Sequence, residues 1–305
     1  MGLVGLGLTA RAAAPLFPGS VRAPAYFTEL WIGLGVLAFL LLLGLYALKT
    51  VLHFTAVRAE FLDPVRLGFC ATLPVSMTLV AAGLAPYLAG IADILWWSGV
   101  VLLGAFAFWG AWRLVWGAIR REVVLAQVNA GLMILFIGGI VVPAGGIALD
   151  HVSMAFGAFA ASALAAPAVM AVVLYRAFAA PDLPEPLRPS WFILLVPPSL
   201  IYAHGTYFSP ESTWLEGLFL VGVALFAALI VYGRRFWHWP FGPSWWAFTF
   251  PLDAFAYAAV RYAHAHPSAL WKGVAALALL AATFVVAMVL ARSLLAARHL
   301  FSKRL

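Results

Sequence analysis

Ten apolar stretches follow one another along this sequence, joined by short polar connections. They lie at residues 1–14, 27–50, 65–89, 94–118, 124–148, 153–178, 189–208, 212–233, 242–263 and 268–296. A helix needs about 20 apolar residues to cross the hydrocarbon layer of a bilayer, so nine of the ten stretches are long enough. The first is too short, and it lacks the basic leader that opens a signal peptide. We therefore expect a truncated first helix, the second half of a spanning helix whose start is missing.

The composition indicates that the whole chain is embedded in a membrane. It is 65% hydrophobic and only 10% charged, whereas soluble domains carry about 25% charged residues. We predict one all-α integral membrane domain over residues 1–305, with ten transmembrane helices. The single cysteine, Cys70, lies within an apolar stretch, so no disulfide framework is expected. The net charge of +7 does not indicate nucleic-acid binding, because the basic residues are scattered over helix ends.

Proline divides the stretches into two alternating sets. The odd-numbered stretches carry proline near the middle, whereas the even-numbered ones mostly do not: Pro74 is in the third, Pro143 in the fifth, Pro197 and Pro198 in the seventh, and Pro251 in the ninth. The first carries Gly2, Gly5 and Gly7 instead. Proline removes a helical hydrogen bond and bends the axis, and only protein or a wet cavity can satisfy the freed carbonyl in a bilayer. This pattern predicts broken helices around a pathway and straighter helices outside them, which indicates transport.

The basic residues predict the orientation. Fourteen lie in the connections after the even-numbered stretches or in the C-terminal tail: Lys49, Arg58, Arg66, Arg113, Arg120, Arg121, Arg176, Arg188, Arg234, Arg235, Arg292, Arg298, Lys303 and Arg304. Four lie on the opposite side: Arg11, Arg22, Arg261 and Lys272. Because Lys and Arg are enriched in cytoplasmic loops, we expect both termini to be cytoplasmic in a multi-pass protein of the cell membrane.

Several motifs occur in a family-specific order. They are Met1 to Leu8 in the first stretch, Asp63 to Arg66 and Ala71 to Ser76 in the third, Val141 to Pro143 in the fifth, Leu187 to Pro189 and Val196 to Pro198 in the seventh, and Trp245 to Leu252 in the ninth. With these motifs the chain resembles the tellurite-resistance and dicarboxylate transporter family, which includes bacterial TehA and the plant guard-cell slow anion channels. The Phe-Pro and Phe-Gly residues that normally precede the first motif are absent.

The resemblance implies a specific architecture and a gate. The ten helices would form five hairpins in a quasi-fivefold arrangement, with the odd helices lining a central pore and the even helices outside. It implies a homotrimer with one pore in each subunit. It also implies that Phe250, before Pro251 in the ninth stretch, plugs the pore. Phe248 is about 200° away around a helix, so both rings cannot face the pore. A phenyl ring across a narrow pore blocks hydrated ions by steric exclusion and dewetting.

Two ionisable residues inside the stretches are candidates for a proton or polar site. Asp253 lies three residues after Phe250, and an ionised carboxylate at that depth costs about 2.5–3.5 kcal/mol on insertion scales. Three interpretations remain open: protonation coupled to transport, a polar contact or pair such as one with Arg261, or altered selectivity. His204 is predicted to make a polar contact with Tyr202, with Tyr207 or with a backbone carbonyl freed by Pro197 and Pro198, and a pore-lining role is the alternative.

The sequence shows no nucleophile with a base, no metal-ligand spacing and no phosphate-binding glycine loop, so we expect no enzyme activity, cofactor or metal. We predict an anion channel or permease for small anions such as chloride and nitrate, with carboxylates and tellurite as further candidates. The expected partners are these anions, membrane lipid and identical subunits, and not nucleic acid. One alternative is a proton-coupled dicarboxylate carrier of the malate type. Another is a structural or redox membrane bundle.

Overall fold

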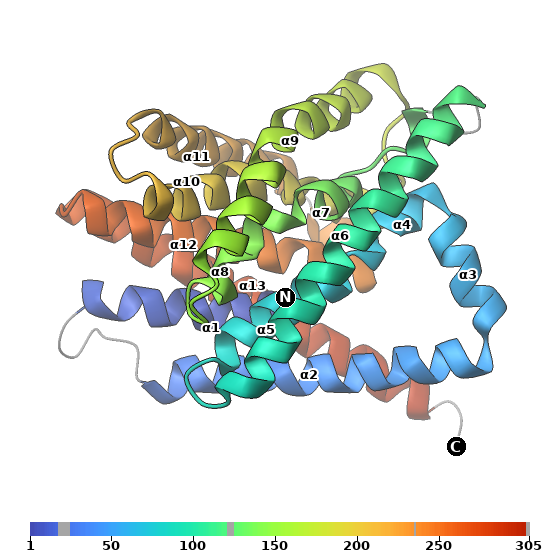
Figure 1. Cartoon of the computed structure of the whole chain (residues 1–305), viewed down its shortest axis with the longest axis horizontal. Helices are drawn as coiled ribbons and strands as arrows, with labels where there is room; N and C mark the ends of the chain where they lie inside the picture. The colour runs from blue at the N-terminus through green and yellow to red at the C-terminus, as the bar shows by residue number, and fades with distance from the viewer. Residues whose placement is uncertain (18–24, 121–124, 235, 303–305) are drawn as a thin grey trace.

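The computed structural model describes residues 1–17, 25–120, 125–234 and 236–302, and every regular element within them is a helix (Figure 1). The all-α class is thereby confirmed for these residues. Five of the basic residues used to predict orientation lie outside them: Arg22, Arg121, Arg235, Lys303 and Arg304.

Five long helices are continuous, and each corresponds to an even-numbered stretch. They are α2 (Ala25–Leu52), α6 (Ala89–Ile119), α9 (Val152–Ala179), α11 (Trp214–Gly233) and α13 (Ala269–Ser302). We call them the outer helices. Only 17% to 28% of the most apolar window of each is buried, and their exposed side chains are mostly large and hydrophobic. Such a surface is what lipid or a neighbouring subunit would cover. In Figure 1, α2 runs along the lower edge and α6 crosses the front.

The odd-numbered stretches fold into shorter pieces, which we call the inner segments. The first is α1 (Gly2–Ala13) with the 3₁₀ turn η1 (Ala14–Leu16), and the second is α4 (Pro64–Cys70) with α5 (Thr72–Leu84). The third is η3 (Leu125–Gln127), α7 (Gly131–Ile137), η4 (Gly138–Val141) and α8 (Pro143–Gly146). The fourth is η5 (Glu185–Leu195) with α10 (Val196–Phe208), and the fifth is η7 (Pro243–Phe248) with α12 (Thr249–Ala265). Two further short helices, α3 (Phe54–Leu62) and η6 (Phe236–His238), complete the connections.

The prolines stand at the start of α-helices inside these segments. Pro143 is the first residue of α8, Pro197 is the second of α10, and Pro74 and Pro251 are the third residues of α5 and α12. The first N–H groups of a helix have no partner within it, so proline there costs no hydrogen bond. The segments are therefore divided by a 3₁₀ or turn portion before each proline. The sequence predicted broken helices near these prolines, and the structure places each of the four in the first turn of the α-helix that follows a break.

The contacts between elements follow a simple pattern. Each inner segment packs on the outer helix that follows it: α1 on α2, α5 on α6, α7 and α8 on α9, α10 on α11, and α12 on α13. The inner segments also touch one another in a closed circuit, from α1 to α5, α5 to α8, η4 to α10, α10 to α12, and α12 back to α1. The core of the protein therefore lies among the inner segments.

Six helices in the described ranges are long and apolar enough to cross a membrane. They are the outer helices and the continuous stretch Arg66–Leu84. The remaining odd-numbered stretches are short or divided, so a count of ten spans and a quasi-fivefold arrangement stay predictions.

Candidate functional site

Helix α12 exposes a single narrow stripe. Between Thr249 and Ala263, every residue is buried except Phe250, Tyr257 and Arg261. These residues are seven and four positions apart, so they lie on one face of the helix. The rest of α12 packs against α1, α10, α13 and the 3₁₀ segments η5 and η7. The stripe therefore marks where this largely buried helix meets open space.

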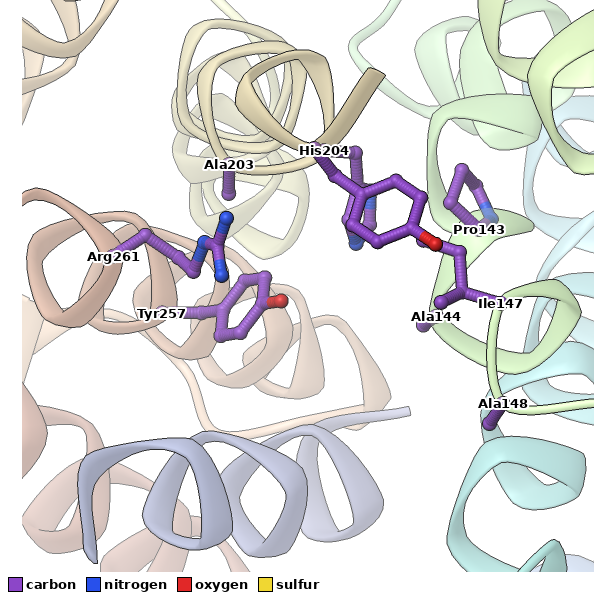
Figure 2. A pocket seen from close by; sticks show the side chains of 9 residues that line it. Pro143, Ala144, Ile147, Ala148, Ala203, His204, Tyr257 and Arg261 are labelled. Atoms are coloured by element: carbon purple, nitrogen blue, oxygen red, sulfur yellow. The ribbon is translucent and has the colours of Figure 1, made fainter. Parts of the chain in front are cut away.

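A cavity of about 260 Å³ lies at one end of this stripe. Its walls come from three inner segments, and Tyr257 and Arg261 of α12 form one side. Pro143 and Ala144 of α8 form the opposite side, and His204 projects from α10 between them (Figure 2). Arg261 belongs to the face that the distribution of basic residues predicts to be non-cytoplasmic. Among the residues that line the cavity it is the only one with a permanent charge.

Phe250 and Phe248 have different surroundings, although only one residue separates them. Phe248 is 4% exposed, and its ring packs edge-on against that of Phe192, with 4.7 Å between the centroids. It also stacks on Trp239. Phe250 is half-buried and has no aromatic ring contact among the described residues. Phe248 is thus held in an aromatic cluster, whereas Phe250 is a partly buried side chain on the accessible stripe that packs against the edge of the core.

The 3₁₀ segment η7, which comes directly before α12, is held against α13 by two contacts. The Arg292 guanidinium of α13 lies 4.8 Å from the ring centroid of Trp245, and Trp245 is fully buried. Trp246 Nε1 donates a hydrogen bond of 3.1 Å to Ser293 Oγ. Cation–π contacts of this kind contribute about 0.5–2 kcal/mol each. The cation–π contact and the hydrogen bond together hold the segment just before Phe250 against α13.

Asp253 faces α1 and not the stripe. Its side chain is 1% exposed, and neither carboxylate oxygen has a hydrogen-bond partner among the described residues. A Cβ atom at Gly5 would lie 2.9 Å from Asp253 Oδ2, so only glycine leaves room for the carboxyl group. Thr9 Oγ1 of α1 donates a 3.3 Å hydrogen bond to the Asp253 carbonyl. The structure describes no ion pair between Asp253 and Arg261.

His204 makes a contact of the kind that the sequence predicts, with a different partner. Its Nδ1 lies 2.7 Å from the Ile140 carbonyl oxygen. A carbonyl only accepts hydrogen bonds, so Nδ1 is the donor. The Ile140 carbonyl cannot accept a 3₁₀ bond from Pro143, which has no N–H. His204 therefore satisfies a carbonyl freed by Pro143 and not by Pro197 or Pro198, and its ring also lines the cavity.

The other predicted pore-lining or kink residues occupy two kinds of position. Pro143 lines the cavity. Gly5, Pro74, Pro197, Pro198 and Pro251 are buried in the contacts between segments. Their part in a pathway stays a prediction, as does gating by Phe250.

The sequence analysis missed Tyr257 and placed Arg261 only as a topology signal or a partner for Asp253. Their spacing of seven and eleven residues from Phe250 was the available signal, because it puts all three on one helical face. Among the described residues no group of three or more His, Cys, Asp or Glu side chains could hold a metal ion.

Comparison of the sequence with known proteins identifies a family. Residues 1–294 match the family described as SLAC1, voltage-dependent anion channel. The chain is 28% identical to the S-type anion channel SLAH2 of Arabidopsis thaliana over 225 residues, which is 71% of this chain and 42% of the relative. It is 28% identical to SLAH3 over 251 residues (77% and 38%). It is 26% identical to the guard cell channel SLAC1 of the same plant over 238 residues (73% and 40%).

The chain spans about two fifths of the length of these plant relatives. The family match nevertheless covers nearly all of it, and its apolar helices are those of a multi-pass membrane protein. The resemblance seen in the sequence motifs is thereby confirmed. This protein belongs to the SLAC1 family of voltage-dependent anion channels.

Proposed function

We propose that this protein is an anion channel in which the inner segments surround a conduit and the side chain of Phe250 closes it. The observation that carries the proposal is the stripe on α12, because the accessible positions between Thr249 and Ala263 run from Phe250 to a cavity with a cationic wall. The closed circuit of contacts among the inner segments supports a central position for the conduit. Family membership supports anions as the permeant species.

The inner segments favour anions through backbone dipoles and a positive side chain. Helices α5, α10 and α12 all begin within their apolar stretches, so their N-terminal ends lie inside the protein. A helix N-terminus carries about half a positive charge, and such ends of broken membrane helices attract anionic groups. Chloride and nitrate fit this weak potential, and carboxylates and tellurite are further candidates.

The proposal includes the assembly that the family resemblance implies. Ten helices would form five hairpins with quasi-fivefold symmetry, and three identical subunits would each contain one conduit. Both termini would be cytoplasmic and the protein would lie in the cell membrane. The exposed apolar surface of the outer helices supports contact with lipid and with neighbouring subunits.

Replacing the gate side chain tests the proposal. Phe250→Ala removes the ring, so we expect a several-fold rise in anion conductance of the purified protein in planar bilayers. Phe248→Ala is the matched control, since that ring packs in the cluster with Phe192 and Trp239. The control should lower stability without raising conductance. Equal conductance of Phe250→Ala and the unmodified protein would remove Phe250 from the gate.

A further inference from the structure

Arg261 is a cation without a counter-charge in the wall of the cavity. Its Nε atom is buried and has no hydrogen-bond partner among the described residues, and the structure describes no salt bridge to it. Arginine stays protonated in proteins, and leaving a buried charge uncompensated costs several kcal/mol. Water or an anion in the cavity must therefore provide the compensation.

Acidic side chains of neighbouring elements do not fill this role. Glu216 Oε1 of α11 lies 3.3 Å from His266 Nε2. Asp253 is eight residues before Arg261 on the same helix, about 12 Å along the axis at 1.5 Å per residue, and it faces Gly5. Arg11 shows the contrast: its guanidinium is neutralised by Glu29 at 3.1 Å. The described part of the chain gives Arg261 no such partner.

Two tyrosine side chains line the same cavity. Tyr257, one turn before Arg261, and Tyr207 at the end of α10 both line the cavity. Figure 2 shows the Arg261 guanidinium and the Tyr257 ring side by side at the open space. Guanidinium N–H and phenol O–H groups are donors that suit an anion. The remaining walls are mostly apolar, with Pro143, Ala144 and Ala203 among them.

The dimensions and charge limit the ligand. A cavity of about 260 Å³ has room for about eight waters at about 30 Å³ each, so a small anion fits with part of its hydration shell. One guanidinium balances one negative charge. A second charge would remain uncompensated against the apolar walls, which is costly.

We propose that Arg261, Tyr257 and Tyr207 form a binding site for one small monovalent anion at the predicted non-cytoplasmic end of the conduit. The proposal rests on the function proposed above and adds a saturable site to it. An anion held there stands on the same face of α12 as Phe250, about 16 Å away along the helix axis. An anion entering from the predicted non-cytoplasmic side would occupy this site before it reaches Phe250.

Binding to the purified full-length chain tests the site separately from transport. Nitrate is the probe, with gluconate replacing it to keep ionic strength constant, and the melting temperature is measured as a function of nitrate concentration. A ligand that binds the folded state raises the melting temperature in a saturable manner. We expect Arg261→Gln to raise the half-saturating concentration about tenfold or more, the effect of losing one charged hydrogen-bonding group.

Three further variants separate coordination from general charge. Lys272→Gln removes an exposed cation on the same predicted face and should leave half-saturation unchanged. Arg261→Lys keeps the charge but loses the planar fork, so binding should weaken less than in Arg261→Gln. Tyr257→Phe keeps the ring but removes the hydroxyl group, so it should weaken nitrate binding several-fold. It tests the same site if Arg261→Gln does not fold.

The melting experiment tests the binding site, and a separate flux experiment tests the channel function. Equal half-saturation for the unmodified protein, Arg261→Gln and Tyr257→Phe, or no saturable effect in the unmodified protein, would overturn the site. Nitrate flux into liposomes is measured in parallel. Absence of flux in the unmodified protein would contradict the proposed channel, while an Arg261-dependent melting shift would still support the binding site.

Discussion

Phe250 and Asp253 are one helical turn apart, and the local packing gives them different capabilities. The Phe250 ring is half-buried on the accessible stripe of α12, without an aromatic partner among the described residues. The Asp253 carboxyl is enclosed against Gly5, and its oxygens have no hydrogen-bond partner in the described part of the chain. A half-buried ring on an accessible face is a candidate for a plug, and this role of Phe250 stays a prediction. An enclosed carboxyl group cannot exchange readily with ions in a conduit.

Replacing Asp253 with asparagine tests whether proton coupling contributes to transport. Asp253→Asn keeps the size of the side chain and removes its ability to ionise. Because Asp253 faces α1 and not the cavity, we expect the pH profile of nitrate flux in liposomes to remain that of the unmodified protein. Phe250→Ala, measured in the same assay, should raise flux at all pH values. A flattened or shifted profile in Asp253→Asn would instead favour the proton-coupled carrier.

The motif around Pro251 predicts a gating role for Phe250 and not for Phe248, and that role stays a prediction. The structure gives the two rings different surroundings, with Phe248 in an aromatic cluster and Phe250 on the accessible stripe. The orientation of Asp253 was not predictable. Three residues correspond to about 300° of rotation, and which neighbour occupies that side depends on the close approach of α1 at Gly5. Such an approach is a property of tertiary packing.

At the scale of elements, a side chain replaces a backbone hydrogen bond that is lost where an inner segment is divided. The break before Pro143 leaves the Ile140 carbonyl without a helical donor, and His204 of α10 supplies one at 2.7 Å. The sequence predicted breaks near the prolines. It could not show that each proline begins a helix, because a first-turn proline and a mid-helix proline look alike in an apolar stretch.

The bond between α10 and η4 predicts a measurable loss of stability. His204→Leu leaves the buried Ile140 carbonyl unpaired, and we expect the free energy of unfolding to fall by about 1–3 kcal/mol. His204→Asn places an amide N–H close to the former Nδ1 position and should recover part of the loss. Thermal melting of the purified protein measures both. Equal melting temperatures for His204→Leu and the unmodified protein would show that the bond contributes nothing.

At the scale of the whole molecule, burial alternates along the chain. The outer helices expose apolar side chains and the inner segments pack together, in agreement with the proline distribution in the sequence. The cavity beside Arg261 could not be located in this way, because it needs the relative rotation of α8, α10 and α12. That rotation is set by contacts such as those between His204 and Ile140, which join residues 64 positions apart.

Cysteine accessibility along α12 tests most directly whether its stripe faces an anion conduit. The background is Cys70→Ser, which removes the only native thiol. Single variants Phe250→Cys, Tyr257→Cys and Arg261→Cys are compared with Ala256→Cys and Ala259→Cys at buried positions. A charged thiol-reactive reagent should change anion current for the first three and leave the other two unaffected. Reaction without this periodicity, or none at Tyr257→Cys and Arg261→Cys, would contradict a conduit along this face.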